Sequence, residues 1–143
     1  MPSSATFKAA NALQRFMQKA SFGRLGWSGY GMPVVELTTT GRKSGQPRTV
    51  LLTSPWQEGD TFALIGSAGG NDRDPSWVHN IKAEPSVTVR MRGGPARSMK
   101  ARVATADERA RLWPVITKDH SNYAGYQKKT DREIPVVLVE PAG

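Results

Sequence analysis

Short apolar and β-branched runs, separated by glycine- and proline-rich turns, recur through the chain from residue 34 onward. They predict strands at Val34–Leu37, Thr49–Thr53, Thr61–Ile65, Val87–Met91, Met99–Ala104 and Ile134–Val139. Alternation of apolar and polar positions is clearest in 87–91 and 99–104, as expected for strands with one face on a core. Six short strands with brief connections favour mostly antiparallel neighbours.

Helical spacing replaces this alternation at the N-terminus. In residues 5–21, apolar side chains recur every three or four positions, which predicts an amphipathic helix. Basic side chains occupy the rest of its surface, so the helix either packs on the sheet or lies against an anionic membrane surface. Residues 22–33 are rich in glycine and are expected to form a loop before the first strand.

Capping residues mark two further helices. Asp74 is expected to be the N-cap of a helix that has Pro75 in its first turn and ends near Ala83. Thr105 and Glu108 have the spacing of a capping box for a helix through about Thr117. Residues 119–129 have a weaker helical pattern. The pattern as a whole predicts an α+β fold of about six strands, an N-terminal helix and two or three further helices.

Length and composition limit the class of protein. At 143 residues the chain is expected to form one domain, 1–143, with a substantial core, in which 1–33 form the N-terminal helix and linker. The absence of cysteine excludes disulfides and thiol chemistry and fits a cytoplasmic protein. No apolar run reaches the roughly 20 residues that a membrane-spanning helix needs. The net charge of +8 favours an anionic partner: nucleic acid, a membrane surface or a small polyanion.

The strongest local candidate for chemistry is the turn from Thr38 to Arg48, between the first two predicted strands. It contains three cations, Arg42, Lys43 and Arg48, together with hydroxyls and the glycines Gly41 and Gly45. If both glycines adopt positive φ, the turn can direct backbone amides inward and form an anion-binding concavity ringed by cations. The simpler alternative is a solvated hairpin loop.

Several familiar chemistries lack their motifs. The two histidines, His79 and His120, have no metal-ligand spacing. No nucleophile elbow, nucleotide-hydrolase phosphate loop or dinucleotide fingerprint is present.

An ordered set of motifs resembles the deazaflavin-dependent nitroreductase family of actinobacteria. It comprises Thr38-Thr39-Thr40-Gly41-Arg42-Lys43-Ser44-Gly45-Gln46-Pro47-Arg48, Gly66-Ser67-Ala68-Gly69-Gly70, Asp74-Pro75-Ser76-Trp77-Val78-His79-Asn80-Ile81, Ala83-Glu84-Pro85, Tyr123-Ala124-Gly125-Tyr126-Gln127, Thr130-Asp131-Arg132 and Ile134-Pro135-Val136. The set spans roughly residues 34 to 141 in the family's order. The resemblance implies a split β-barrel that binds the deazaflavin coenzyme F420 and transfers a hydride from ring carbon C5 to a quinone or nitro compound.

The resemblance also implies roles for individual residues. The cofactor-binding residues it gives are Arg42, Lys43, Ser44, Gln46, Arg48, Ser67, Ser76 and Trp77, and the catalytic residues are Tyr123, Tyr126 and Ser67. The cations would hold the phosphate and the acidic tail, Ser67 would face the ring, and the tyrosines would line the acceptor side. Ala68 and His120 depart from the family pattern, where some relatives carry Lys and Tyr. No metal and no nucleic acid is expected.

Two alternatives remain open at this point. A split barrel can also bind a flavin such as FMN, and the Gly41–Arg48 turn would serve its phosphate equally well. The basic charge would also suit a non-enzymatic module for nucleic acid or a lipid surface, although no nucleic-acid motif or aromatic stacking stripe is present. The resemblance leaves the oligomeric state open.

Overall fold

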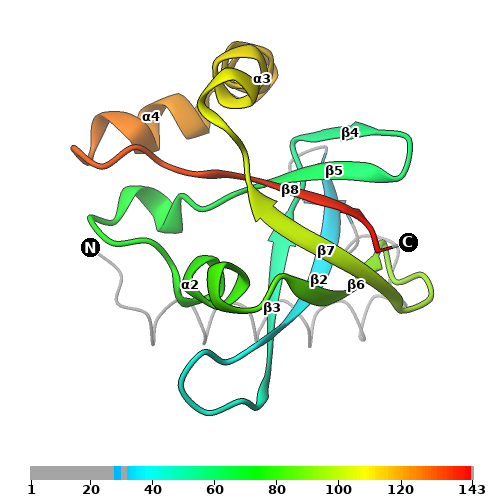
Figure 1. The fold of residues 1–143 in the computed structure, drawn as a ribbon. Helices are drawn as coiled ribbons and strands as arrows, with labels where there is room; N and C mark the ends of the chain where they lie inside the picture. The colour runs from blue at the N-terminus through cyan, green and yellow to red at the C-terminus, as the bar shows by residue number, and fades with distance from the viewer. Residues whose placement is uncertain (1–27, 30–31, 143) are drawn as a thin grey trace.

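A computed structural model describes residues 28–29 and 32–142 and has an α+β fold (Figure 1). The strands of this part of the chain are β1 (Ser28–Gly29), β2 (Met32–Thr40), β3 (Pro47–Thr53), β4 (Trp56–Glu58), β5 (Thr61–Ile65), β6 (Ser86–Met91), β7 (Arg97–Val103) and β8 (Val136–Pro141). The six predicted strands are all present, and the short strands β1 and β4 are additions. The helix expected at 5–21 lies outside the described residues.

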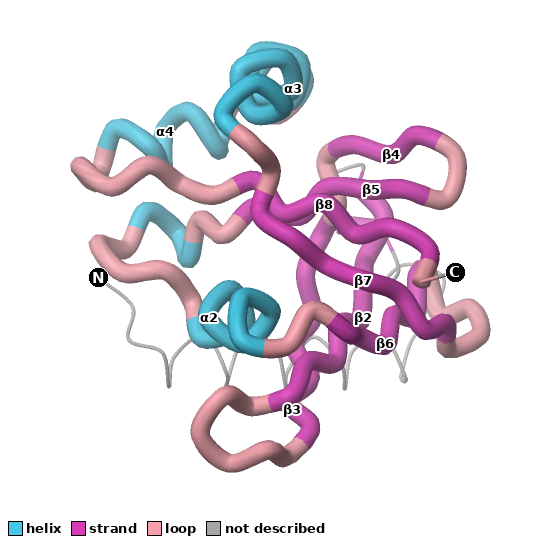
Figure 2. Tube along the Cα trace, viewed as in Figure 1, coloured by secondary structure: helices cyan, strands magenta, loops and turns pink. Residues whose placement is uncertain are grey.

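All strand pairs of the described sheet are antiparallel. The strands follow the order β1-β2-β6-β7-β8-β5-β4, and β3 pairs with β2. Strand β2 therefore pairs with β3 as well as β6, and its residues 32–33 belong to the strand rather than to the expected loop. Figure 2 shows these strands curling around a common centre, as expected for a split barrel.

Alternate residues of the same strands supply two separate cores. On β5, Phe62 and Leu64 face one hydrophobic cluster, whereas Ala63 and Ile65 face the other. Strand β8 divides in the same way, because successive side chains point to opposite faces of a sheet. Both strands are consequently buried on both faces.

Helices cover these two cores from different sides. The helices of the described residues are α2 (Ser76–Ala83), α3 (Ala106–Asp119) and α4 (Asn122–Lys128), with a 3-10 turn, η1 (Ala68–Gly70). Helix α2 contributes Trp77, Val78 and Ile81 to the first cluster. Helices α3 and α4 cover the second cluster, against which Trp56 and Trp113 also pack. The assignment of these two tryptophans to packing is confirmed.

The helix boundaries test the capping predictions. Thr105 and Glu108 form the predicted capping box, with the Glu108 amide donating to Thr105 Oγ1 over 3.2 Å. The prediction for Asp74 is wrong: Pro75 is the N-cap residue of α2, and no side chain caps that end. The Asp74 carboxylate instead accepts a 2.7 Å hydrogen bond from Arg132 Nη1. In the part of the chain that the structure describes, the helices are too short or too polar to cross a membrane.

Candidate functional site

The turn between β2 and β3 is closed by its own backbone. The Gly41 amide donates to Gln46 O, and the Gly45 amide donates to Gly41 O, both over 2.8 Å. Gly45 has φ +71°, as predicted, but Gly41 does not have a positive φ. Space is tight at Gly41 instead, because a Cβ there would lie 3.2 Å from the backbone oxygen of Gln46 and 2.7 Å from Ser44 Oγ.

Backbone amides of this turn donate to acceptors within the protein. The Gln46 amide donates to Ser44 Oγ over 3.1 Å, and the Arg42 amide donates to Asn80 Oδ1, also over 3.1 Å. With the two glycine amides also engaged, four of the N–H groups expected to point at an anion are already occupied. The prediction of an inward-facing amide concavity is therefore wrong for these positions, and the basic side chains provide the positive charge.

Asn80 links the turn to helix α2 through two side-chain hydrogen bonds. Its side chain is 5% exposed, and its Nδ2 donates to Thr39 Oγ1 over 3.0 Å while its Oδ1 accepts from the Arg42 amide. A buried amide needs such partners, because an unsatisfied polar group in the interior is costly. The sequence reasoning missed Asn80. The available signal was an amide among the apolar residues Trp77, Val78 and Ile81 on the buried side of α2.

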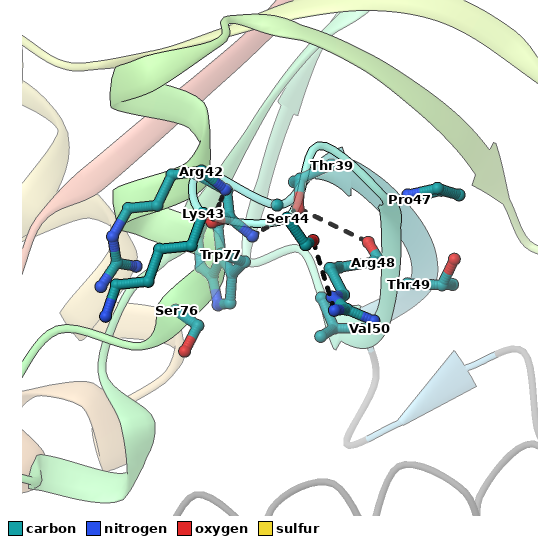
Figure 3. Close-up of a pocket in the computed structure, with 12 residues that line it drawn as sticks. Thr39, Arg42, Lys43, Ser44, Pro47, Arg48, Thr49, Val50, Ser76 and Trp77 are labelled. Atoms are coloured by element: carbon teal, nitrogen blue, oxygen red, sulfur yellow. Dashed lines mark hydrogen bonds between the residues drawn. The ribbon is translucent and has the colours of Figure 1, made fainter.

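A cleft of about 550 Å³ lies between the turn, β3 and the start of α2. It is lined by Thr39, Gly41, Arg42, Lys43, Ser44, Pro47, Arg48, Thr49, Val50, Ser76, Trp77 and Asn80. In the view of Figure 3, the Arg42 and Lys43 side chains extend in the same direction, toward the side on which Ser76 lies. The volume falls within the range of sites for cofactors and other small molecules.

The cations of this cleft are available to an anion. The side chains of Arg42 and Lys43 are exposed and form no hydrogen bond or ion pair within the described residues. Arg48 is also exposed, and the one partner of its guanidinium among the residues that the structure describes is Ser44 Oγ, to which Nη2 donates over 3.3 Å. Three cations that have no acidic partner in the described part of the chain surround one cleft and suit a phosphate or carboxylate. The planar forks of the arginines can each bind two oxygens.

The residues expected to lie near the deazaflavin ring, which we call the ring end of the site, occupy two neighbouring segments. Ser76 and Trp77 form the first turn of α2 and line the cleft. Trp77 is only 5% exposed and belongs to the hydrophobic cluster as well, so one side chain contributes to both core and cleft. Ser67 is 8% exposed and does not line the cleft; it begins the loop that leads from β5 through η1 to α2. Gln46 lies in the turn but outside the cleft lining.

Tyr123 and Tyr126 lie on α4, away from the cation-lined cleft. Their rings meet edge to face with centroids 6.1 Å apart. Tyr123 is buried and its hydroxyl donates to Met32 Sδ over 3.7 Å, whereas Tyr126 is half-buried. Burial raises the pKa of the Tyr123 phenol, so the group stays a neutral hydrogen-bond donor at physiological pH. Helix α4 contacts η1, which connects the tyrosines to the segment that carries Ser67 (Figure 1).

Metal chemistry has no support in the described residues. Within 28–29 and 32–142, no group of three or more His, Asp or Glu side chains could hold a metal ion. The arrangement of cations, a small cleft and a partly accessible tryptophan instead suits an anionic cofactor with a planar ring.

The curled antiparallel sheet and its first hairpin define a split-barrel protein with a cation-lined cleft. A family model described as F420H(2)-dependent quinone reductase matches residues 11–141. The chain therefore belongs to this family of F420-dependent oxidoreductases. The resemblance inferred from the ordered motifs, the redox class and the cofactor expected with it are confirmed.

Individual relatives agree with this assignment. The F420H(2)-dependent quinone reductase of Mycobacterium tuberculosis strain H37Rv is 39% identical over 122 residues, which cover 82% of this chain and 80% of the relative. A solved structure of an F420-H2 dependent reductase, FDR-A, superposes with a TM-score of 0.65 at 41% identity. That match covers 76% of this chain and 94% of the other.

A more distant likeness concerns the fold alone. A protein from Listeria innocua, described as a pyridoxamine 5'-phosphate oxidase, superposes with a TM-score of 0.53 at 13% identity and covers 92% of this chain and 94% of that chain. The predicted α+β split barrel is confirmed.

Proposed function

We propose that this chain binds reduced F420 with its phosphate and acidic tail among Arg42, Lys43 and Arg48, and reduces a quinone placed beside the deazaflavin ring. The observation that carries the proposal is the set of three cations around a cleft at the start of α2, which have no acidic partner among the described residues, in a chain of this family. The remaining steps concern how the protein's own residues would serve that reaction.

The donor set fits the anionic part of the cofactor. A phosphodiester and glutamate carboxylates present oxygens in pairs, which arginine forks bind with two hydrogen bonds, and Lys43 adds a point charge. Because four amides of the turn are engaged within the protein, side chains would make most of these contacts. The turn itself is held in place by Asn80, so little ordering of the backbone is needed when an anion binds.

The ring end would lie toward Ser76, Trp77 and Ser67. Trp77 lines the cleft and is held in the hydrophobic cluster, so it loses little conformational entropy when a ligand binds. Ser67 lies at the start of the adjoining loop. Rigid positioning of this kind is what hydride transfer requires, since proximity and alignment supply much of its rate.

The acceptor side would be formed by α4. Of the two tyrosines, Tyr126 is the partly exposed one, and its hydroxyl is proposed to donate to a quinone oxygen as negative charge develops there. Tyr123 supports it from the core through their edge-to-face contact. Reduced F420 bound in this cleft would supply a hydride from ring C5, and a quinone that accepted this hydride and a proton from solvent would become the hydroquinone. A nitro compound could occupy the same position.

The proposal is tested by mixing the protein with reduced F420 and a soluble quinone without oxygen, and following the return of oxidised-cofactor absorbance. Turnover that depends on both protein and quinone is expected, with saturation in the cofactor. Competition with FMN distinguishes the flavin alternative. Failure to bind F420 at micromolar concentration, or displacement of F420 by equimolar FMN, would reject the proposal.

A further inference from the structure

The Ser67–Asp74 loop has an unusual backbone. Three successive residues have positive φ: Ala68 at +45°, Gly69 at +66° and Gly70 at +85°. Left-handed conformations are unfavourable for a residue with a Cβ, so Ala68 is held there by its surroundings. Gly70 has no room for a side chain, because a Cβ would lie 2.9 Å from Tyr126 O. The loop that begins with Ser67 is therefore a defined and strained segment.

Arg132 bridges the two ends of this loop. Its Nη2 donates to Ser67 O over 2.9 Å and its Nε to Asn71 O over 2.8 Å. Its Nη1 donates to Asp74 Oδ1 over 2.7 Å. One guanidinium thus contacts the residue before the left-handed run, the residue after it, and the last loop residue before Pro75 and α2.

The backbone of Arg132 is itself held from α4. Gln127 Nε2 donates to Arg132 O over 2.7 Å, while Gln127 Oε1 accepts from the Ile134 amide over 2.9 Å. Arg132 has a side chain that is only 15% exposed. The guanidinium is therefore fixed at its base and at its tip, and it joins the segment that follows α4 to the loop that precedes α2.

We propose that Arg132 is a positioning residue, which keeps Ser67 and the first turn of α2 in place against the deazaflavin ring. This inference rests on the proposed function. Arg132 does not line the cation-lined cleft, so it acts on the ring end and not on the phosphate end. It should therefore affect the rate of hydride transfer more than the affinity for the cofactor.

The geometry requires a guanidinium and not merely a positive charge. The three nitrogens of the planar Arg132 guanidinium each donate to a different acceptor, two of them to backbone carbonyls and one to a carboxylate. A lysine would keep the charge opposite Asp74 but has one nitrogen on a flexible stem and cannot hold the three acceptors in a fixed arrangement. Arg132→Lys is accordingly the informative variant.

The matched control is Arg102→Lys. Arg102 also makes three hydrogen bonds, to the carboxylates of Glu108 and Glu140, but it lies on β7 outside the cleft. For both variants and the wild type we would measure the F420 dissociation constant by ring fluorescence, kcat with a quinone at saturating cofactor, and amide hydrogen exchange in the cofactor-free protein.

For Arg132→Lys we expect kcat to fall at least tenfold and the dissociation constant to rise less than threefold. The amides of Gly70 and Asn71, which close the loop onto Ser67 O and Ala68 O, should exchange faster than in the wild type. Arg102→Lys should leave kcat and these amides unchanged. A kcat within twofold of the wild type, or a loss that falls on affinity instead, would overturn the inference.

A second variant guards against misfolding. If Arg132→Lys does not fold, Asp74→Ala removes the acceptor of Arg132 Nη1, and the same criteria apply. Asp74 also pairs with Lys82 over 3.8 Å, so Lys82→Ala is the control for that variant. The two proposals fail differently. A wild type that does not bind F420 refutes the proposed function, whereas a wild type that turns over alongside an equally active Arg132→Lys refutes only the positioning role.

Discussion

Single residues of the turn differ in how freely they can meet an anion. Arg42 and Lys43 have no side-chain partner within the described residues, whereas Arg48 must share its guanidinium with Ser44 Oγ at 3.3 Å. A weak hydrogen bond to an exposed serine is easily exchanged for one to a phosphate. All three cations can therefore contribute to binding without first breaking an ion pair.

Removing one of these cations should weaken cofactor binding. For Lys43→Ala and Arg48→Ala we expect a higher F420 dissociation constant, equivalent to a loss of about 1–3 kcal/mol of binding free energy. The loss should be greatest for cofactor molecules with a long acidic tail. Lys100→Ala is a control with the same change in net charge on an exposed position of β7. Fluorescence titration measures all three. Equal affinities for the three variants and the wild type would place the tail elsewhere.

A substitution at Tyr126 tests the proposed acceptor side of the site. Tyr126→Phe keeps the ring that packs on Tyr123 and removes only the hydroxyl. We expect slower quinone reduction, by about 10-fold or more if the hydroxyl stabilises developing charge, with near-normal cofactor affinity. An unchanged kcat would assign Tyr126 to packing alone.

At the scale of elements, the cleft depends on how the β2–β3 hairpin is joined to α2. Asn80 provides that junction through Thr39 Oγ1 and the Arg42 amide. Local signals in the sequence predicted the hairpin and the helix, but they contained nothing about a bond between residues 41 positions apart. The same limit explains Asp74, whose preference for an N-cap is outweighed by a pairing with Arg132, 58 residues away.

Asn80→Ala should disconnect these elements. It removes both hydrogen bonds and leaves the Thr39 hydroxyl and the Arg42 amide without this partner. We expect the free energy of unfolding to fall by about 1–3 kcal/mol and the affinity for F420 to fall with it. Denaturant unfolding and cofactor titration of the same preparation give the two values. Unaltered affinity in a destabilised protein would show that the cleft does not need this junction.

The capping box of α3 makes a pH-dependent contribution to stability. Hydrogen bonds from Arg102 and from the Thr105 amide lower the pKa of Glu108 to about 2. The folded state thus holds the carboxylate ionised where the unfolded state would protonate it. The stabilisation is fully present above about pH 4.5 and is lost as the pH falls toward 2.

Glu108→Gln should remove this contribution. We expect its free energy of unfolding to depend less steeply on pH between about 4.5 and 2 than that of the wild type, as measured by denaturant unfolding at a series of pH values. Asp107→Asn, in the same helical turn, is the control. Parallel pH profiles for the wild type and Glu108→Gln would contradict the assignment.

At the scale of the molecule, the pattern of strands and helices predicted an α+β fold with mostly antiparallel neighbours, and the family resemblance alone implied the split barrel. They placed Arg42, Lys43, Ser44, Arg48, Ser76 and Trp77 in one site, and the structure brings these six around one cleft. The bond from the Arg42 amide to Asn80 and the bridge from Arg132 to Ser67 were not predictable, because each joins residues distant in sequence. The other engaged amides of the turn bond within the turn itself.

The most direct test of the central claim is a crystal structure of the protein with F420. We predict the cofactor phosphate within hydrogen-bonding distance of Arg42, Lys43 or Arg48, and the ring beside Trp77 and Ser67. A cofactor bound on another surface, with the turn facing open solvent, would contradict the account.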